Sequence, residues 1–467
     1  MLYASLLRVA ENKTGDGKVS ILVKDRKFYR TLFPLIAVIA LQNVITFVVA
    51  LADNVMLGMY SETALSGAAL VNQIQFLLQM VVGGIGEGML VMTSRFWGAK
   101  DITSIKKTTA VGLLLGIITA AGMWAAVFFL PREVLSLFTF EQTVIGEGTQ
   151  YMQIVCFSYV FFAVNSILLA SLRSVETVKI GFIVSVISLG VNIFLNYMLI
   201  FGNFGAPELG ARGAAIATLA ARIVEVGATC LYVFRIDQKI RLKMRELLRI
   251  SGTIFRQYIK VGTPVIVSGA MWGVAMAIQA AILGHMGQTA IAANSIAAAV
   301  FEVVTVVAYA SASAAAVVIA KTLGEDRKEM VKPYTRTLQM IFLMIGAATG
   351  IILFFLKDMI VGLYSITPET KQLALEFMTI LSVTVVGTAY QMPALTGIVR
   401  GGGDTKFVMI NDLIFMWGIV LPISAFAAFV WSWSPVLVFI CLKSDQILKC
   451  FVAVAKVNRY RWIKQLS

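Results

Sequence analysis

The stretch FPLIAVIALQNVITFVVALADNVML, residues 33–57, holds a single charged side chain, that of Asp53. A helix of this length and apolarity is long enough to cross a bilayer. A carboxylate in the hydrocarbon core costs on the order of 3 kcal/mol, and such groups usually face a partner or a cavity. The stretch therefore predicts a membrane-spanning helix that carries a functional carboxylate.

The remainder of the chain has the same character. Of its 467 residues, 59% are hydrophobic and 14% are charged, with a mean hydropathy of +0.85; soluble domains carry about 25% charged residues. We expect an all-α integral membrane protein with twelve transmembrane helices. The predicted spans are 33–56, 66–92, 109–130, 150–171, 178–200, 211–234, 261–283, 289–320, 335–356, 373–398, 407–430 and 435–456.

The basic residues predict the orientation of these spans. Segments 1–33, 234–260 and 321–336 hold seven, eight and five Lys and Arg, whereas the opposite loops hold four in all. An excess of Lys and Arg marks the cytoplasmic side. We therefore expect a multi-pass protein of the plasma membrane with both termini in the cytoplasm. The net charge of +14 follows from this topology and does not indicate a nucleic-acid partner.

The two halves of the chain are similar to each other. When the sequence is shifted by 226 residues, LGMYSETAL (57–65) aligns with LGHMGQTAI (283–291) at four identical positions. Because each half has an even number of spans, the halves are parallel repeats about an axis normal to the membrane. The predicted domains are a cytoplasmic segment 1–32, an N-terminal six-helix lobe 33–234, a linker 235–260, a C-terminal six-helix lobe 261–456 and a tail 457–467.

The linker has two open interpretations. Its apolar residues recur at helical spacing, which is typical of an amphipathic helix on the membrane surface. A solvated connector fits its many charges equally well. The apolar residues concerned are Ile240, Met244, Leu247 and Leu248.

Several motifs resemble those of the multidrug and toxic compound extrusion (MATE) family of prokaryotic cation-coupled efflux transporters. They are ADNVMLG (52–58), GAKD (98–101), VNIFLNYMLIFG (191–202), GARGAAIAT (210–218) and RGGGDTK (400–406). The resemblance implies two six-helix lobes in a V and an antiporter that exports organic cations or drugs as H⁺ or Na⁺ enters. It implies no enzymatic activity and no cofactor, and we expect the protein to act as a monomer with small organic cations and the bilayer as partners.

Asp53 is the best candidate for the coupling-ion site, because it coincides with the acid of the family's first span. Asn192 and Asn196 are four residues apart and share one helix face, and Thr218 matches a threonine of the family's sixth span. Some relatives have an aspartate at the position of Asn196. The single carboxylate leaves both a Na⁺ ion at Asp53 and a proton site open.

Other family members carry acids in the seventh and tenth spans, and the corresponding positions here are Trp272 and Ala389. Coupling is therefore expected to run through the N-terminal lobe. Further intramembrane charges allow pairing at helical spacing: Asp445 with Lys449, and Arg222 with Glu225. We interpret these pairs and Asp412 as structural, and the role of Glu87 is open.

Substrate contacts are predicted from polar, aromatic and Met residues within spans, which suit flat cations through cation–π contacts and adaptable packing. Glu302 is added as an acid without an evident local partner. The candidates are Gln42, Gln75, Phe76, Gln79, Trp272, Met276, Gln279, Glu302 and Tyr390.

Two other functions are weighed against the antiporter. A flippase for lipid-linked precursors needs several cations in its cavity to hold a diphosphate, and the spans carry few. An intramembrane enzyme needs a nucleophile pair, a metal cluster or an Asp-rich motif, and the sequence has none of these patterns. The lone candidate carboxylate favours a cationic guest.

Overall fold

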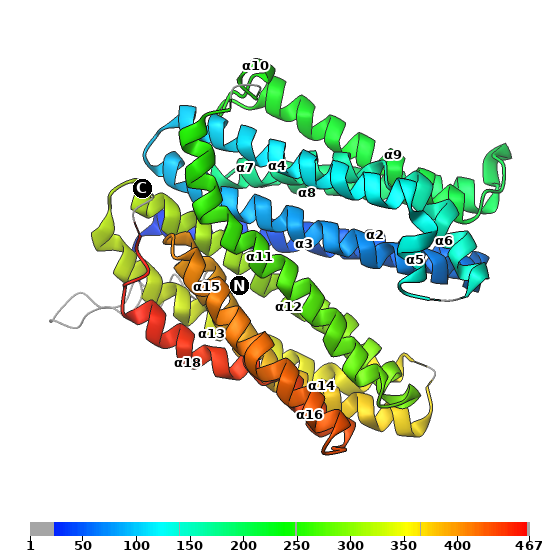
Figure 1. Cartoon of the computed structure of the whole chain (residues 1–467). Coiled ribbons are helices and arrows are strands. Elements are labelled where there is room, and N and C mark those ends of the chain that lie inside the picture. Colours follow the sequence, from blue (N-terminus) through cyan, green and yellow to red (C-terminus); the bar gives the residue numbers. More distant parts are fainter. Residues whose placement is uncertain (1–22, 140, 248–249, 365, 465–467) are drawn as a thin grey trace. The chain divides into compact units, whose positions relative to one another are not determined.

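The computed structural model describes residues 23–139, 141–247, 250–364 and 366–464. Within these residues the regular elements are helices, and one isolated antiparallel bridge joins Gly403 and Ile463. The long helices run side by side in bundles (Figure 1). The described part of the chain thus confirms the predicted all-α membrane class.

The elements follow one another along the chain as long helices with short connections. They are α2 (Arg26–Tyr60), α3 (Glu62–Gly98), α4 (Ile102–Phe129), α5 (Pro131–Ser136), α6 (Gln142–Val155), α7 (Ser158–Ser174), α8 (Lys179–Phe201), η1 (Asn203–Gly205), α9 (Ala211–Leu231), η2 (Tyr232–Ile236), α10 (Met244–Leu247), α11 (Gly252–Gly284), α12 (Gln288–Gly324), α13 (Lys328–Gly362), α14 (Pro368–Met392), η3 (Pro393–Val399), α15 (Thr405–Asp412), η4 (Leu413–Val420), α16 (Leu421–Phe429), α17 (Pro435–Lys443) and α18 (Asp445–Asn458).

Ten helices of the described chain are long and apolar enough to cross a membrane without a break. The predicted fourth span consists of α6 and α7, which are bent by 52° at a short break. The predicted twelfth span consists of α17 and α18, which meet at Ser444 between Lys443 and Asp445. Twelve spans are consistent with these helices, but two of the spans are broken.

The chain forms two compact units. One contains residues 38–279 and 405–418, and the other contains residues up to 37, 280–404 and residues from 419 onward. Both units thus draw on segments that are far apart in the sequence. The lobe boundaries predicted from the repeat remain a prediction.

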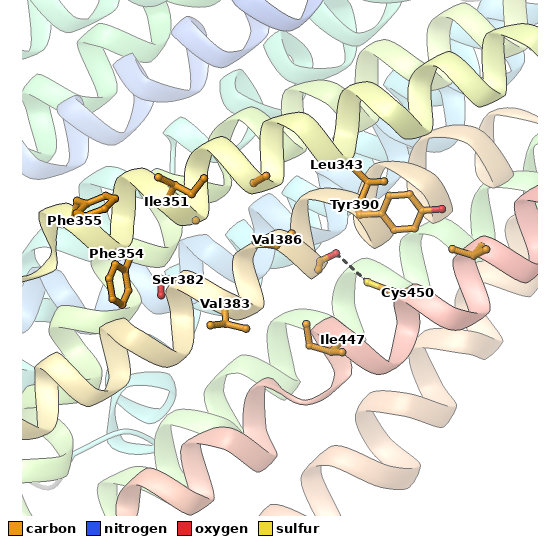
Figure 2. Close-up of a pocket in the computed structure, with 14 residues that line it drawn as sticks. Leu343, Ile351, Phe354, Phe355, Ser382, Val383, Val386, Tyr390, Ile447 and Cys450 are labelled. Atoms are coloured by element: carbon orange, nitrogen blue, oxygen red, sulfur yellow. Dashed lines mark hydrogen bonds between the residues drawn. The ribbon is translucent and has the colours of Figure 1, made fainter. Parts of the chain in front are cut away.

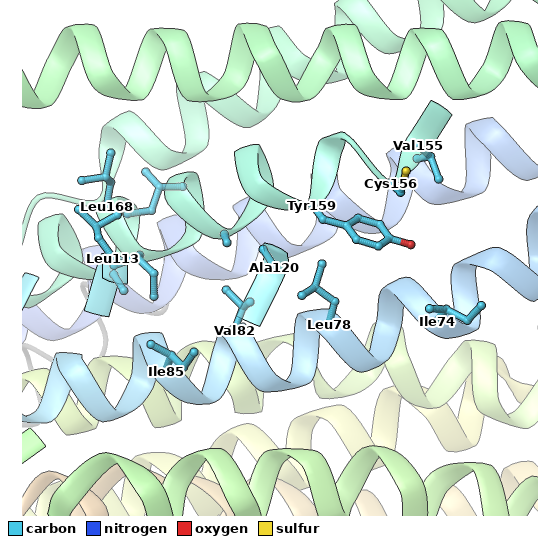
Figure 3. Packing of buried hydrophobic residues seen from close by; sticks show 14 of the residues in the cluster. Ile74, Leu78, Val82, Ile85, Leu113, Ala120, Val155, Cys156, Tyr159 and Leu168 are labelled. Atoms are coloured by element: carbon cyan, nitrogen blue, oxygen red, sulfur yellow. The ribbon is translucent and has the colours of Figure 1, made fainter. Parts of the chain in front are cut away.

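The core of the first unit is centred on α3. Ile74, Leu78, Val82 and Ile85 recur every three or four residues and form one buried stripe (Figure 3). Residues from α4 and α7, including Tyr159, pack in the same cluster. The helix begins at Ser61, whose side chain accepts a hydrogen bond from Ala64 N and so satisfies one of the first backbone donors.

A neighbouring face of α3 approaches α11 backbone to backbone. A Cβ atom at Gly84 would lie 2.8 Å from Ile266 Cα, and one at Gly88 would lie 2.9 Å from Gly262 Cα. Small residues allow such close approach between membrane helices and are typical of their interfaces. This contact fixes α11 beside the helix that carries the predicted residues Gln75, Phe76 and Gln79.

The predicted amphipathic helix in the linker is wrong for the described residues. Regular helix there is limited to α10 and to the start of α11 at Gly252, and Leu248 lies outside the described residues. Ile240 is buried in the core cluster of the first unit. The Asp237 carboxylate accepts hydrogen bonds from Ile240 N at 2.8 Å and Arg241 N at 3.2 Å, which favours a turn over a helix.

Gly84→Leu is expected to lower the free energy of unfolding by about 1–3 kcal/mol, because a side chain there forces α3 away from α11. Thermal unfolding in detergent micelles measures the effect. Gly83→Leu is the matched control, since a Cβ atom at Gly83 meets nothing within 4 Å. Equal effects of the two substitutions would contradict the close contact.

Candidate functional site

Asp53 lies in the last two turns of α2, half-buried against α8. Asn196 Nδ2 donates a hydrogen bond to Asp53 Oδ1 at 2.5 Å and is 3.2 Å from Asn192 Oδ1. Both asparagine side chains are fully buried. The structure therefore brings together the three residues that the sequence analysis placed at a common site.

Thr218 is buried on α9, the helix that packs along α8. Tyr151 of α6 is adjacent to Thr218 and interacts electrostatically with Asp53. The sequence analysis missed Tyr151, because a lone tyrosine in an apolar helix has no signal of its own. The site thus draws on four helices: α2, α6, α8 and α9.

The donor set fits a small cation or a proton. Asn196 Oδ1 is buried and has no hydrogen-bond partner among the described atoms. The Asp53 carboxylate lies next to the side-chain amide of Asn196. Carboxylate and amide oxygens are ligands for hard cations. A carboxylate whose solvation is replaced by amides is also a group that can exchange a proton.

Other intramembrane charges are paired, as their spacing predicted. Arg222 Nη1 lies 2.6 Å from Glu225 Oε2 on α9. Lys449 Nζ lies 3.3 Å from Asp445 Oδ2 on α18, and both side chains are almost fully buried. Pairing lowers the cost of placing a charge in hydrocarbon.

Glu87, whose role was open, and Asp412, which was interpreted as structural, both contact side chains of other helices. Glu87 Oε1 is 3.3 Å from Arg173 Nη1, which links α3 to α7. Asp412 Oδ2 accepts a 2.7 Å hydrogen bond from Ser268 Oγ of α11. Both carboxylates are therefore bound to neighbouring helices. Glu302, by contrast, is exposed on α12.

Several predicted substrate residues cluster where α3 meets α11. The rings of Phe76 and Trp272 are 6.3 Å apart at 47°. Gln279 Nε2 lies 3.3 Å from Met416 Sδ of η4. Gln75 is buried, while Gln79 and Met276 are half-buried. Gln42 packs against Gly181 of α8, on the same helix pair as Asp53 and Asn196.

Tyr390 lies in the other unit, at a groove between α13, α14 and α18 (Figure 2). The groove has a volume of about 720 Å³, and none of its lining side chains is charged. The Tyr390 hydroxyl donates a 2.7 Å hydrogen bond to Gln339 Oε1 of α13. The groove thus lacks a carboxylate, and its aromatic side chains Phe354, Phe355 and Tyr390 are its only groups that attract cations.

Comparison with known proteins finds a matching family model and similar sequences for this chain. A family model described as MatE matches residues 39–198 and 264–426. A probable multidrug resistance protein NorM from Thermotoga maritima is 25% identical over 388 residues, covering 82% of each chain. A protein of the same description from Listeria monocytogenes is 24% identical over 437 residues, covering 93% of this chain and 94% of the relative.

Solved structures share the fold at low sequence identity. A MATE protein crystallised in complex with MaL6 superimposes with a TM-score of 0.84 at 16% identity and covers 92% of this chain and 96% of its own. A MOP superfamily transporter from Pyrococcus furiosus, described as having a binding pocket of reverse polarity, gives 0.85 at 17% identity and covers 97% and 100%. These matches support the fold.

Asp445→Asn is expected to destabilise the chain by about 3–5 kcal/mol, because Lys449 then keeps its buried charge without this carboxylate. The double variant Asp445→Leu/Lys449→Met should recover most of that loss. Asp326→Asn is the control, since its pair with Lys328 is largely exposed and surface pairs contribute about 0–1 kcal/mol. Thermal unfolding measures all three variants, and equal losses for Asp445→Asn and Asp326→Asn would contradict the assignment.

Proposed function

Since the chain belongs to the MatE family, whose members are membrane transporters and not enzymes, we propose that it is a secondary active antiporter that exports organic cations. H⁺ or Na⁺ enters in exchange and binds at Asp53 with Asn192, Asn196 and Thr218. The relatives named as probable multidrug resistance proteins support export of drug-like molecules. In this proposal the protein acts as a monomer in the plasma membrane with both termini in the cytoplasm.

The contact between Asp53 and Asn196 carries the proposal. It places the only acid of the α2 span against two fully buried amides of α8. In this arrangement, hydrogen bonds from the protein replace the water around the carboxylate. A charged, unpaired carboxylate in a membrane is costly, so the site favours binding of a cation. Hydrogen bonds between amides are enough to hold two membrane helices together, so helix packing alone does not require the carboxylate.

The proposed cycle follows from the charge of Asp53. When the site is open to the outer face, H⁺ or Na⁺ binds and removes the charge that required hydrogen bonding from α8. The six-helix half 33–234 then rearranges relative to the half 261–456, and the organic cation leaves on the outer side. The coupling ion drives this step only by its difference in affinity between the two conformations.

The substrate is proposed to bind along α3 and α11, with the aromatic pair Phe76 and Trp272 as its main contact. An organic cation stacked on an indole gains about 0.5–2 kcal/mol, depending on its desolvation. Gln75, Gln79, Met276 and Gln279 lie on the same two helices. Gln42, Glu302 and Tyr390 stay as weaker candidates.

Asp53→Asn is expected to reduce ion-driven efflux of a fluorescent organic cation to the rate of empty liposomes. Asparagine keeps the shape of the side chain but carries no negative charge, so it does not take up a proton and it attracts Na⁺ far less than a carboxylate does. The measurement uses proteoliposomes with a Na⁺ gradient or a pH gradient imposed in turn. Glu62→Gln, an exposed acid at the start of α3, is the matched control and should transport normally.

Normal efflux by Asp53→Asn would rule out the assigned coupling site. If neither gradient moves the dye with the wild-type protein, the organic-cation class is wrong. The lipid-precursor flippase would then be the function to test, with a labelled lipid diphosphate in the same vesicles.

Trp272→Ala is expected to slow efflux of flat aromatic cations by roughly two- to thirtyfold, the factor that 0.5–2 kcal/mol corresponds to. Small aliphatic cations should be affected less, which changes the substrate profile. Trp124→Ala is the control, because Trp124 stacks on Phe128 within α4. An unchanged profile in Trp272→Ala would assign the indole to helix packing.

A further inference from the structure

The groove between α13, α14 and α18 lies wholly within one compact unit and has an apolar lining. Helices α13 and α18 both pack on α14. On α14 the lining residues Ser382, Val386 and Tyr390 are spaced four positions apart, so they share one helix face. The lining side chains Ile351 of α13 and Val454 of α18 are exposed. An exposed apolar lining on helices that cross a membrane is suited to contact with hydrocarbon.

The polar side chains of the groove already have partners within the protein. Ser382 Oγ donates a 2.7 Å hydrogen bond to Thr379 O, and the Tyr390 hydroxyl donates to α13 as described above. Cys450 Sγ donates to Gly387 O at 3.5 Å, the contact drawn in Figure 2. These three are the lining side chains that carry a donor. The lining therefore favours a hydrocarbon chain over a polar ligand.

The groove has the length of one leaflet of the bilayer. Its lining on α13 runs from Leu343 to Phe355, a rise of about 18 Å along the helix. One leaflet accounts for about 15 Å of the hydrocarbon core. The predicted span 335–356 ends next to Phe355, and Figure 2 shows Phe355 at one end of the lining and Tyr390 at the other. A single acyl chain that enters from the headgroup region fits this length.

A lysine lies at the Phe355 end of the groove. Lys357 Nζ is 4.4 Å from the centroid of the Phe354 ring and donates a 2.8 Å hydrogen bond to Thr379 Oγ1 of α14. Within the described residues, no carboxylate forms an ion pair with Lys357. An ammonium has three N–H donors, of which Thr379 accepts one. The other donors are available to a phosphate oxygen.

The charge of Lys357 discriminates between two classes of occupant. An organic cation in the groove would be repelled by this ammonium, which already contacts the ring of Phe354. A phosphate would be attracted to it, and basic groups between membrane helices can bind lipid headgroups. Charge and lining therefore both favour a phospholipid over the organic cations proposed as transport substrates.

We propose that this groove binds one phospholipid, whose acyl chain lies along α13, α14 and α18 and whose phosphate binds Lys357. In the proposed orientation of the chain, the lipid belongs to the outer leaflet. Its acyl chain lies between α13 and α18 and thus adds contacts within one unit. The site shares no residue with the Asp53 site or with the aromatic pair Phe76 and Trp272, and it does not depend on the antiporter function.

The test is retention of dioleoylphosphatidylglycerol by the purified full chain in detergent, measured by native mass spectrometry. The wild type should retain one molecule per chain at a small excess of lipid. Ala347→Trp places an indole in the groove and should lose the bound lipid. Ala348→Trp is the matched control, because Ala348 is exposed on the same helix but does not line the groove.

The headgroup contact is tested separately. Lys357→Gln should weaken retention by roughly two- to fivefold, the factor that a partly exposed ion pair contributes. Lys371→Gln should leave retention unchanged, because Lys371 is an exposed residue of α14 outside the groove lining. Dioleoylglycerol has the same chains without the phosphate, and the wild type should retain it as weakly as Lys357→Gln retains the phospholipid.

Absence of bound lipid in the wild type would overturn the proposal, as would equal retention by Ala347→Trp and Ala348→Trp. Equal retention of dioleoylglycerol and the phospholipid would also overturn it, because Lys357 would then have no role. If Ala347→Trp fails to fold, Val383→Trp fills the same groove from α14.

The efflux assay separates a lipid site from a substrate site. A changed cation profile in Ala347→Trp with unchanged lipid retention would overturn the lipid site and assign the groove to the substrate. Failure of the antiporter function would leave the lipid-binding test intact, because retention is measured without transport.

Discussion

A charged side chain within a membrane-spanning helix must be solvated by the protein, because the hydrocarbon core supplies neither water nor counter-ions. The arrangement of helices in both units follows this constraint. Asp53 is solvated by Asn196, Arg222 by Glu225 and Asp445 by Lys449. Two of these contacts lie within one helix, but Asp53 depends on a second helix. In the proposed cycle, this dependence makes α2 and α8 respond to the charge of a single carboxylate.

Small residues allow close packing between the helices. Where α3 meets α11, and where α13 meets α14, glycines bring helix backbones together: a Cβ atom at Gly350 would lie 2.5 Å from Ser382 O. Such contacts are rigid, because no side chain lies between the helices to adapt. The contact between α2 and α8 at Asp53 is polar, and in the proposed cycle one proton or ion makes and breaks it. Rigid pairs beside one switchable pair suit a protein that alternates between conformations.

Much of this was predictable from the sequence, for identifiable reasons. Hydropathy locates the spans, and spacing along one helix predicts the Arg222–Glu225 and Asp445–Lys449 pairs, because both partners lie on the same element. The contact between Asp53 and Asn196 joins residues 143 positions apart, and it was expected through the family resemblance. Tyr151 was missed, since no periodicity relates α6 to α2 and α8. Of the two interpretations of the linker, the amphipathic helix was wrong, because local hydrogen bonds to Asp237 outweigh a weak helical pattern.

The family resemblance assigns further acids to two positions that are Trp272 and Ala389 in this chain. Trp272 is packed against Phe76, so the seventh-span position is part of an aromatic contact. Ala389 is buried. A Cβ atom added at Gly346 of α13 would lie 3.1 Å from the Cβ atom of Ala389. A carboxylate at 389 would need space that α13 occupies. Helix packing thus fills both positions, which is consistent with the proposed coupling site at Asp53 and its neighbours on α6, α8 and α9.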